Sequence, residues 1–193
     1  MDAQLRQDVD EVVTERVMRA VATLVRRGVD DLTFARTAAE SGVAERTLYR
    51  RYPTKAALLE GFWHWLNKKI DAPAAPQSAA ELIEQIPSLY AAFEADEALV
   101  RAMLHDRNGR EVRLAQADAR RKRLRVALKD VLAPLGAKER EHLLASVQLI
   151  ASAAGWESMK DNWGLSGKAA GEAAQWAVMS LIDAARQART RRS

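Results

Sequence analysis

Four side chains between residues 46 and 55 combine positive charge or a hydroxyl group with helical spacing. Arg46, Tyr49 and Arg50 lie three and four positions apart, so they share one face of a short helix, and Lys55 follows at the next helix start. Cations and hydroxyls in this pattern bind phosphate oxygens, and a helix that carries them fits the major groove of DNA. The pattern therefore predicts a DNA-binding surface.

Local signals around this face predict a short helix, a turn and a second short helix. Thr33 can accept a hydrogen bond from an otherwise unpaired backbone N–H, and so cap a helix that starts at Phe34. Gly42 can adopt the left-handed conformation that ends this helix. Pro53 lacks an N–H and disfavours helix at Tyr52, so the second helix must be short.

The second helix and its successor have their own signals. Ala44, Leu48 and Tyr52 recur every four residues, which predicts an inward-facing stripe. Thr54 offers a cap for the next helix, which should run to about residue 69. Lys55 opposes the dipole of that helix at a cost of about 0.3–1 kcal/mol. A bound phosphate would turn this cost into an advantage, and a solvated surface lysine is the alternative.

The same segment resembles the DNA-binding signature of the tetracycline-repressor (TetR) family. The shared features are a helix-starting threonine, an internal alanine, a Gly-Val turn, a Thr-Leu-Tyr run, an aromatic residue before the next turn and a lysine. They are Thr33, Ala38, Gly42, Val43, Thr47, Leu48, Tyr49, Tyr52 and Lys55. Two positions depart from the family pattern, since Thr37 replaces a large aliphatic residue and Ala44 replaces a Ser or Thr cap.

The resemblance implies which side chains hold the phosphates. Thr33, Tyr49 and Lys55 should make these contacts, and Arg50 and Arg51 could strengthen them. Such contacts fix the register of the protein on DNA and carry no direct sequence information. A packing role is the alternative for Tyr49.

Base recognition is expected from the first turn of the second helix. Glu45, Arg46 and Thr47 lie there, where side chains can reach base edges. Arg46 would favour guanine, with about 1–3 kcal/mol of discrimination. Glu45 could accept from cytosine, or could simply complement the positive end of the helix.

The composition and the pattern of breaks predict an all-α protein of two domains. Hydrophobic residues make up 48% of the 193, with only 9 Gly and 5 Pro. Segment 72–80, which holds two prolines and small residues, separates a three-helix DNA-binding domain at 1–70 from a second domain at 78–193. Further helices are predicted at 8–27 (closed by Gly28), 81–95, 97–105, 109–132, 138–163 and 168–189.

The resemblance implies that the C-terminal domain dimerises and binds a small-molecule effector. The last two predicted helices are rich in small and apolar residues, more than one surface stripe requires. They could pair with a symmetry mate in a four-helix interface, or be covered within the monomer. Candidate pocket residues, each equally compatible with core packing, are Tyr90, Phe93, Met103, Leu104, Trp156, Met159 and Trp163.

One cationic run lies outside the predicted DNA-binding surface. Residues 117–126 read ADARRKRLRV. A second nucleic-acid contact or an anionic ligand is possible there, and a solvated helix face is the favoured interpretation because acids elsewhere can balance the charge.

The sequence favours no enzyme, metal or cofactor class. There is no cysteine, and His64, His105 and His142 fall on three different predicted helices without metal-binding spacing. The chain has neither a glycine-rich phosphate loop nor a nucleophile elbow. The first residues are acidic and no apolar run approaches the roughly 20 residues of a membrane span. We therefore expect a cytoplasmic protein without membrane contact.

Together these features predict a homodimeric, ligand-responsive transcription regulator, usually a repressor in this family, that binds a palindromic operator. The net charge of +4 is compatible with DNA but does not identify it. The alternative is a helical dimerisation or partner-binding protein that keeps the helix-turn-helix without an operator.

Overall fold

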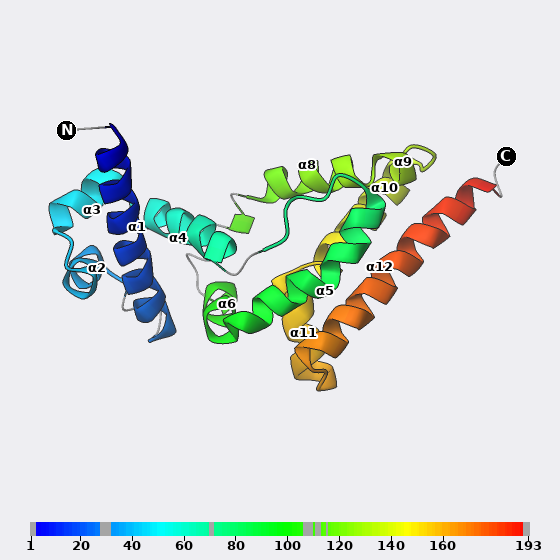
Figure 1. Cartoon of the computed structure of the whole chain (residues 1–193). Coiled ribbons are helices and arrows are strands. Elements are labelled where there is room, and N and C mark those ends of the chain that lie inside the picture. Colours follow the sequence, from blue (N-terminus) through cyan, green and yellow to red (C-terminus); the bar gives the residue numbers. More distant parts are fainter. Residues whose placement is uncertain are drawn as a thin grey trace. The chain divides into compact units, whose positions relative to one another are not determined.

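A computed structural model describes residues 3–27, 32–69, 72–105, 110, 113–114 and 116–190 (Figure 1). The regular structure of these residues is entirely helical, which confirms the predicted all-α class. The chain divides into two compact units. We call Met1–Lys69 with Ala98–Leu114 the N-terminal unit, and Ile70–Glu97 with Ala115–Ser193 the C-terminal unit. No helix among the described residues is long and apolar enough to cross a membrane.

The N-terminal unit is built on a long first helix. Its helices are α1 (Ala3–Arg26), α2 (Phe34–Ser41), α3 (Glu45–Arg51), α4 (Lys55–Lys69) and all of α6 (Glu97–His105) except its first residue. Helix α1 packs against α2 and α4, and α2 packs against α3 (Figure 1). Val17, Val21, Leu48 and Phe62 are fully buried between these helices. Gly28, predicted to close the first helix, lies outside the described residues.

The C-terminal unit contains α5 (Ala79–Ala95), α8 (Ala117–Ala127), α9 (Lys129–Leu132), α10 (Ala137–Ile150), α11 (Ala153–Trp163) and α12 (Gly167–Thr190). Helix α12 runs along α5 and also contacts α10 and α11 (Figure 1). Ala170, Ala174, Val178 and Ile182 form the fully buried stripe of α12. The predicted linker is non-helical up to Ser78, which caps α5.

The single helix predicted at 138–163 is wrong, because the chain breaks between α10 and α11. Ser152 donates its hydroxyl to the Leu149 carbonyl at 2.7 Å and accepts from the Gly155 N–H at 3.2 Å. A Cβ atom at Gly155 would lie 2.6 Å from the Leu149 oxygen and 2.7 Å from the Ile150 oxygen. A serine cap followed by a glycine that permits close backbone approach therefore replaces the helical hydrogen bonds.

The helix predicted at 109–132 is also interrupted in its described part. Helices α8 and α9 are separated at Leu128, whose ψ angle is 11°. The Leu128 N–H still donates to the Leu124 carbonyl at 2.9 Å, so the main chain departs from helical geometry at Leu128 while it keeps this helical hydrogen bond. Leu128 itself is fully buried.

Candidate nucleic-acid interface

Helix α2 begins and ends as its sequence predicts. The Thr33 hydroxyl oxygen accepts from the Arg36 N–H at 3.1 Å, and Gly42 ends the helix with a φ of 65°. Thr37, at the position where the resemblance expects an aliphatic residue, is fully buried. Its hydroxyl donates to the Thr33 carbonyl at 2.8 Å, so its polar atom is satisfied inside the core.

Helix α3 has seven residues, between Ala44 and Tyr52. Leu48 is buried and Tyr52 is half-buried, as the inward stripe predicted, but Ala44 is exposed. Ala44 precedes the helix with φ −56° and ψ 135°, so helical spacing does not apply to it. It also makes no side-chain cap bond, as expected from the missing hydroxyl.

The outward face of α3 carries the predicted DNA contacts. Glu45, Arg46, Tyr49 and Arg50 are exposed, and Thr47 is half-buried. Tyr49 keeps 48% of its surface exposed. The side chains that could touch base edges and phosphates are therefore accessible on one short helix.

Helix α4 starts beside this face with the predicted cap. The Thr54 hydroxyl oxygen accepts from the Ala57 N–H at 3.1 Å. Lys55, the first residue of α4, is half-buried, and within the described ranges it has no acidic partner. An ammonium group at a helix N-terminus without an acidic partner in these ranges is a favourable place for a phosphate.

Arg51 lies differently from its neighbour Arg50. Its guanidinium is 2.7 Å from the Asp10 carboxylate of α1, and its side chain is 25% exposed. Arg51, predicted to strengthen the phosphate contacts, is thus engaged in an ion pair between α3 and α1. Sequence spacing could not reveal this pair, because Asp10 is 41 positions away.

Phe34 is the residue of this face that sequence reasoning missed. Its ring stacks on the ring of Tyr49, with centroids 4.2 Å apart and planes inclined by 23°. Helical periodicity carries no signal for this contact, because the two rings come from different helices. The crossing of α2 and α3 brings them together.

A polar contact connects α1 and α4 within the N-terminal unit. The Trp65 indole N–H donates to Glu15 at 2.6 Å, and Arg19 pairs with the same carboxylate at 2.6 Å. The hydrogen bond from Trp65, followed by that from Arg19, outweighs burial and lowers the pKa of Glu15 below its usual value. Glu15 is therefore ionised near neutral pH and ties the two helices together.

The seven predicted pocket residues are divided between the two units. Tyr90, Phe93 and Trp156 form an aromatic cluster in the C-terminal unit, with centroid distances of 6.2 and 5.9 Å. Met159 of α11 is half-buried, and Trp163 is 80% exposed. The other two residues, Met103 and Leu104, belong to the N-terminal unit.

Polar atoms of the aromatic cluster are used within the C-terminal unit. The Tyr90 hydroxyl donates to the Ile150 carbonyl at 2.6 Å, and burial raises the pKa of Tyr90. The Trp156 N–H donates to Glu94 at 3.1 Å. These bonds are those of a satisfied core, and the pocket remains a prediction.

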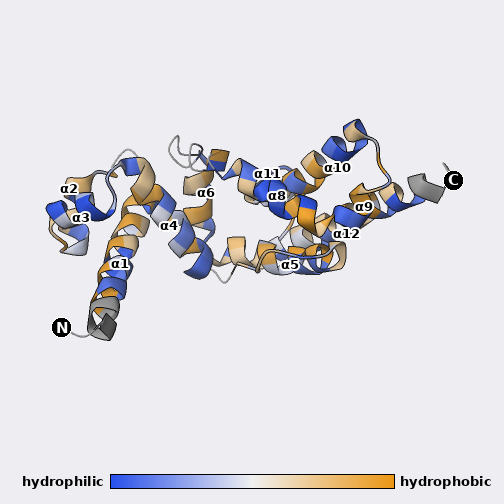
Figure 2. Cartoon of the chain, turned by 90° about the horizontal axis from the view of Figure 1, so that it is seen from above, coloured by the Kyte–Doolittle hydropathy of each residue, from blue (hydrophilic) through white to orange (hydrophobic). Residues whose placement is uncertain are grey.

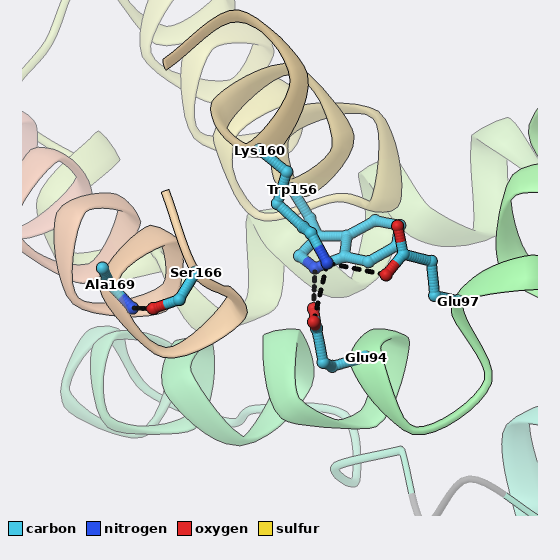
Figure 3. A network of polar contacts seen from close by, with 6 residues as sticks. All are labelled: Glu94, Glu97, Trp156, Lys160, Ser166 and Ala169. Atoms are coloured by element: carbon cyan, nitrogen blue, oxygen red, sulfur yellow. Dashed lines mark hydrogen bonds and ion pairs between the residues drawn. The ribbon is translucent and has the colours of Figure 1, made fainter. Parts of the chain in front are cut away.

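Lys160 completes this network (Figure 3). Its ammonium group contacts Glu94 at 2.6 Å and Glu97 at 2.7 Å, and it lies 5.1 Å from the centre of the Trp156 ring. Burial disfavours the charged lysine, but the hydrogen bonds to both carboxylates outweigh it and raise the pKa of Lys160. Within the C-terminal unit, the network connects Glu94 and Glu97, at the end of its first segment, to α11.

The cationic run at 117–126 lies entirely within α8, which is strongly hydrophilic (Figure 2). Arg121 pairs with Asp118 at 3.3 Å, and Arg125 pairs with Glu141 of α10 at 2.7 Å. Arg125, Lys129 and Arg140 border an open groove of about 400 Å³ between α8, α9 and α10. Part of the charge is thus neutralised by neighbouring acids, as a solvated helix face requires.

The three histidines lie on α4, α6 and α10 and are exposed. Among the described residues, no three metal-ligating side chains gather.

Comparison with known proteins indicates the class of domain to which the N-terminal helices belong. Residues 18–61, which cover the C-terminal part of α1, all of α2 and α3, and the first half of α4, match the family described as "Bacterial regulatory proteins, tetR family". A search of curated proteins found no match. The N-terminal helices are therefore a helix-turn-helix of the DNA-binding type, and this segment is similar to the DNA-binding domain of tetR-family regulators.

Proposed function

We propose that the protein is a dimeric repressor that recognises a near-palindromic DNA operator and releases it on binding a small molecule. The observation that carries the DNA-reading part is the exposed face of α3, flanked by the Thr33 cap and by Lys55, which has no acidic partner in the described part of the chain. Base edges and phosphates can be contacted from these positions together. Access to DNA also makes the cytoplasm the expected location.

Each exposed side chain has a distinct proposed role. Arg46 would read guanine through its bidentate guanidinium, and Glu45 and Thr47 would lie beside neighbouring bases. Tyr49 and Arg50 would donate to phosphates on either side. These roles follow from exposure on one helix face and from the resemblance in this segment.

Exposed apolar residues of the C-terminal unit support a dimer. Trp176 and Met179 of α12 remain 67% and 42% exposed, and Leu149 of α10 is 63% exposed. Helices α10 and α12 contact each other, and the buried stripe of α12 is already covered within the unit. Large apolar side chains left in solvent on contacting helices are typical of an interface.

The dimer would set the spacing of the operator. Two α3 helices related by a two-fold axis should enter successive major grooves, roughly 34–36 Å apart. An effector could release DNA only through its higher affinity for a dimer of different spacing. The effector itself is proposed from the family resemblance alone.

Selection of bound duplexes from a random pool tests the proposal directly. An enriched inverted repeat is the expected result, and Arg46→Ala should relax the preference at one base position while leaving the others unchanged. Binding of all duplexes alike would reject operator recognition. It would favour the alternative of a partner-binding helical protein.

The dimer is tested by the molar mass in solution. Trp176→Glu should shift the dimer to a monomer, because a charge would be buried in the proposed interface. Trp163→Glu is the matched control, since this tryptophan is more exposed and lies at the end of α11. A dimer that survives Trp176→Glu would place the interface elsewhere.

A further inference from the structure

Two aromatic rings meet on the proposed DNA-binding face. Phe34 is the first residue of α2, next to the capping Thr33, and Tyr49 lies in α3. Their rings are stacked with centroids 4.2 Å apart. Stacked aromatic pairs add attraction beyond the area that they bury, so this contact restricts the orientation of the Tyr49 ring.

The ring and the hydroxyl group of Tyr49 differ in their contacts. Its ring is held by Phe34, whereas its hydroxyl has no hydrogen-bond partner among the described residues. An exposed tyrosine without such a support would sample several rotamers and would lose that freedom when it bound DNA. A ring that is already oriented by a neighbour loses less conformational entropy when the side chain binds DNA.

We infer that Phe34 is a positioning residue for DNA binding, whose ring orients Tyr49 so that the phenol hydroxyl is presented to a phosphate. This inference rests on the proposed function, and it assigns a role to a residue outside the motif that carries the family resemblance. Phe34 is half-buried, whereas the core of the unit consists of fully buried residues such as Leu32, Leu48 and Leu58. Replacement of Phe34 by leucine therefore removes the stack and leaves the core in place.

A double-mutant cycle separates orientation of Tyr49 from general packing. We would measure the dissociation constant of a fluorescent mixed-sequence duplex for the unmodified protein, Phe34→Leu, Tyr49→Phe and the double variant. Each single variant should bind about two- to tenfold more weakly, and the double variant about as weakly as Tyr49→Phe. Phe34→Trp, which keeps an aromatic ring, should restore binding.

Salt dependence supplies a second readout. Neither substitution removes a cation, so the slope of log K against log salt should stay unchanged in all variants. Additive effects in the double variant, or a failure of Phe34→Trp to restore binding, would show that Phe34 acts through packing alone and would overturn the inference.

The stack can also be observed without DNA. In the NMR spectrum of the free protein, Phe34→Leu should shift the ring resonances of Tyr49, since a stacked neighbour shields them. Unchanged resonances would overturn the inference while leaving the proposed function intact. If the unmodified protein binds no duplex at any salt concentration, the proposed function fails, and the positioning role fails with it.

Discussion

Lysines in the two units of this protein have opposite surroundings. Lys55, at the start of α4, faces no acidic partner among the described residues. Lys160, in α11, is clamped between two carboxylates and an aromatic ring. A charge without an internal partner is available to an external phosphate, whereas a charge that is already neutralised holds helices together. The comparison indicates that Lys55 is available to bind DNA and that Lys160 stabilises the packing of the C-terminal unit.

The largest expected effect follows from removing the available charge. Lys55→Ala should weaken binding to all duplexes by roughly tenfold or more, because a charge-assisted contact is lost. The slope of log K against log salt should fall in magnitude by about one. Lys138→Ala removes an exposed lysine of α10 and is the matched control, which should change neither value. Equal behaviour of the two variants would mean that Lys55 is only a solvated lysine.

Lys160, which is held by two carboxylates, should affect stability rather than DNA binding. Lys160→Met should lower the free energy of unfolding by about 1–2 kcal/mol, because it leaves two partly exposed carboxylates facing each other. Chemical denaturation measures this change, and the affinity for a mixed-sequence duplex should remain that of the unmodified protein. Lys168→Met, which removes an exposed pair with Glu172, should have little effect on either.

The pH dependence of this contribution has a definite sign. The pKa of Lys160 is raised in the folded protein, so its contribution is complete below the ordinary lysine pKa and is lost as pH rises through the raised value. Lys160→Met should therefore lose its stability deficit in strongly alkaline solution. A deficit independent of pH would point to lost packing over Trp156 instead.

The neighbouring arginines of α3 allow the same comparison, between an available charge and a charge in an ion pair, within one helix. Arg50→Ala should weaken DNA binding several-fold and reduce the salt slope, because Arg50 is exposed on the proposed face. Arg51→Ala should leave the slope unchanged and lower the melting temperature slightly, since its partner is Asp10. A lowered slope for Arg51→Ala would show that Arg51 leaves Asp10 to bind phosphate.

The smallest expected effect is the loss of the stabilising contribution of Glu15 at acidic pH. Its pKa is lowered in the folded protein, so its contribution is present above the ordinary glutamate pKa and is lost as pH falls through the lowered value. Because the Glu15 side chain is 43% exposed, we expect a contribution to the free energy of unfolding of less than about 1 kcal/mol. Trp65→Phe should reduce this acid sensitivity in thermal melts. Acid sensitivity equal to that of the unmodified protein would assign it to other carboxylates.

Local chemistry explains why α2 and α3 could be predicted closely. Thr33, Gly42 and Pro53 act on their immediate neighbours, so they locate helix ends without knowledge of the rest of the fold. Ser152 and Gly155 act in the same local way, so this pair contains the signal for the break between α10 and α11.

Contacts between distant segments could not be predicted. Tyr90, Phe93 and Trp156 meet because α11 packs against α5, and the same periodicity would equally suit an open pocket. Arg50 and Arg51 are identical in type and adjacent in sequence, yet Arg51 pairs with Asp10 of α1 whereas Arg50 is exposed.

By itself, the sequence determined the helical class, the caps of α2 and the outward face of α3, because each depends on backbone hydrogen bonding and on the 3.6-residue repeat within a few residues. Only the tertiary structure decided that Phe34 lies on Tyr49, that Asp10 engages Arg51 and that Lys160 is enclosed. These pairings depend on how helices cross, and the crossing is set by the packing of whole buried faces rather than by any local motif.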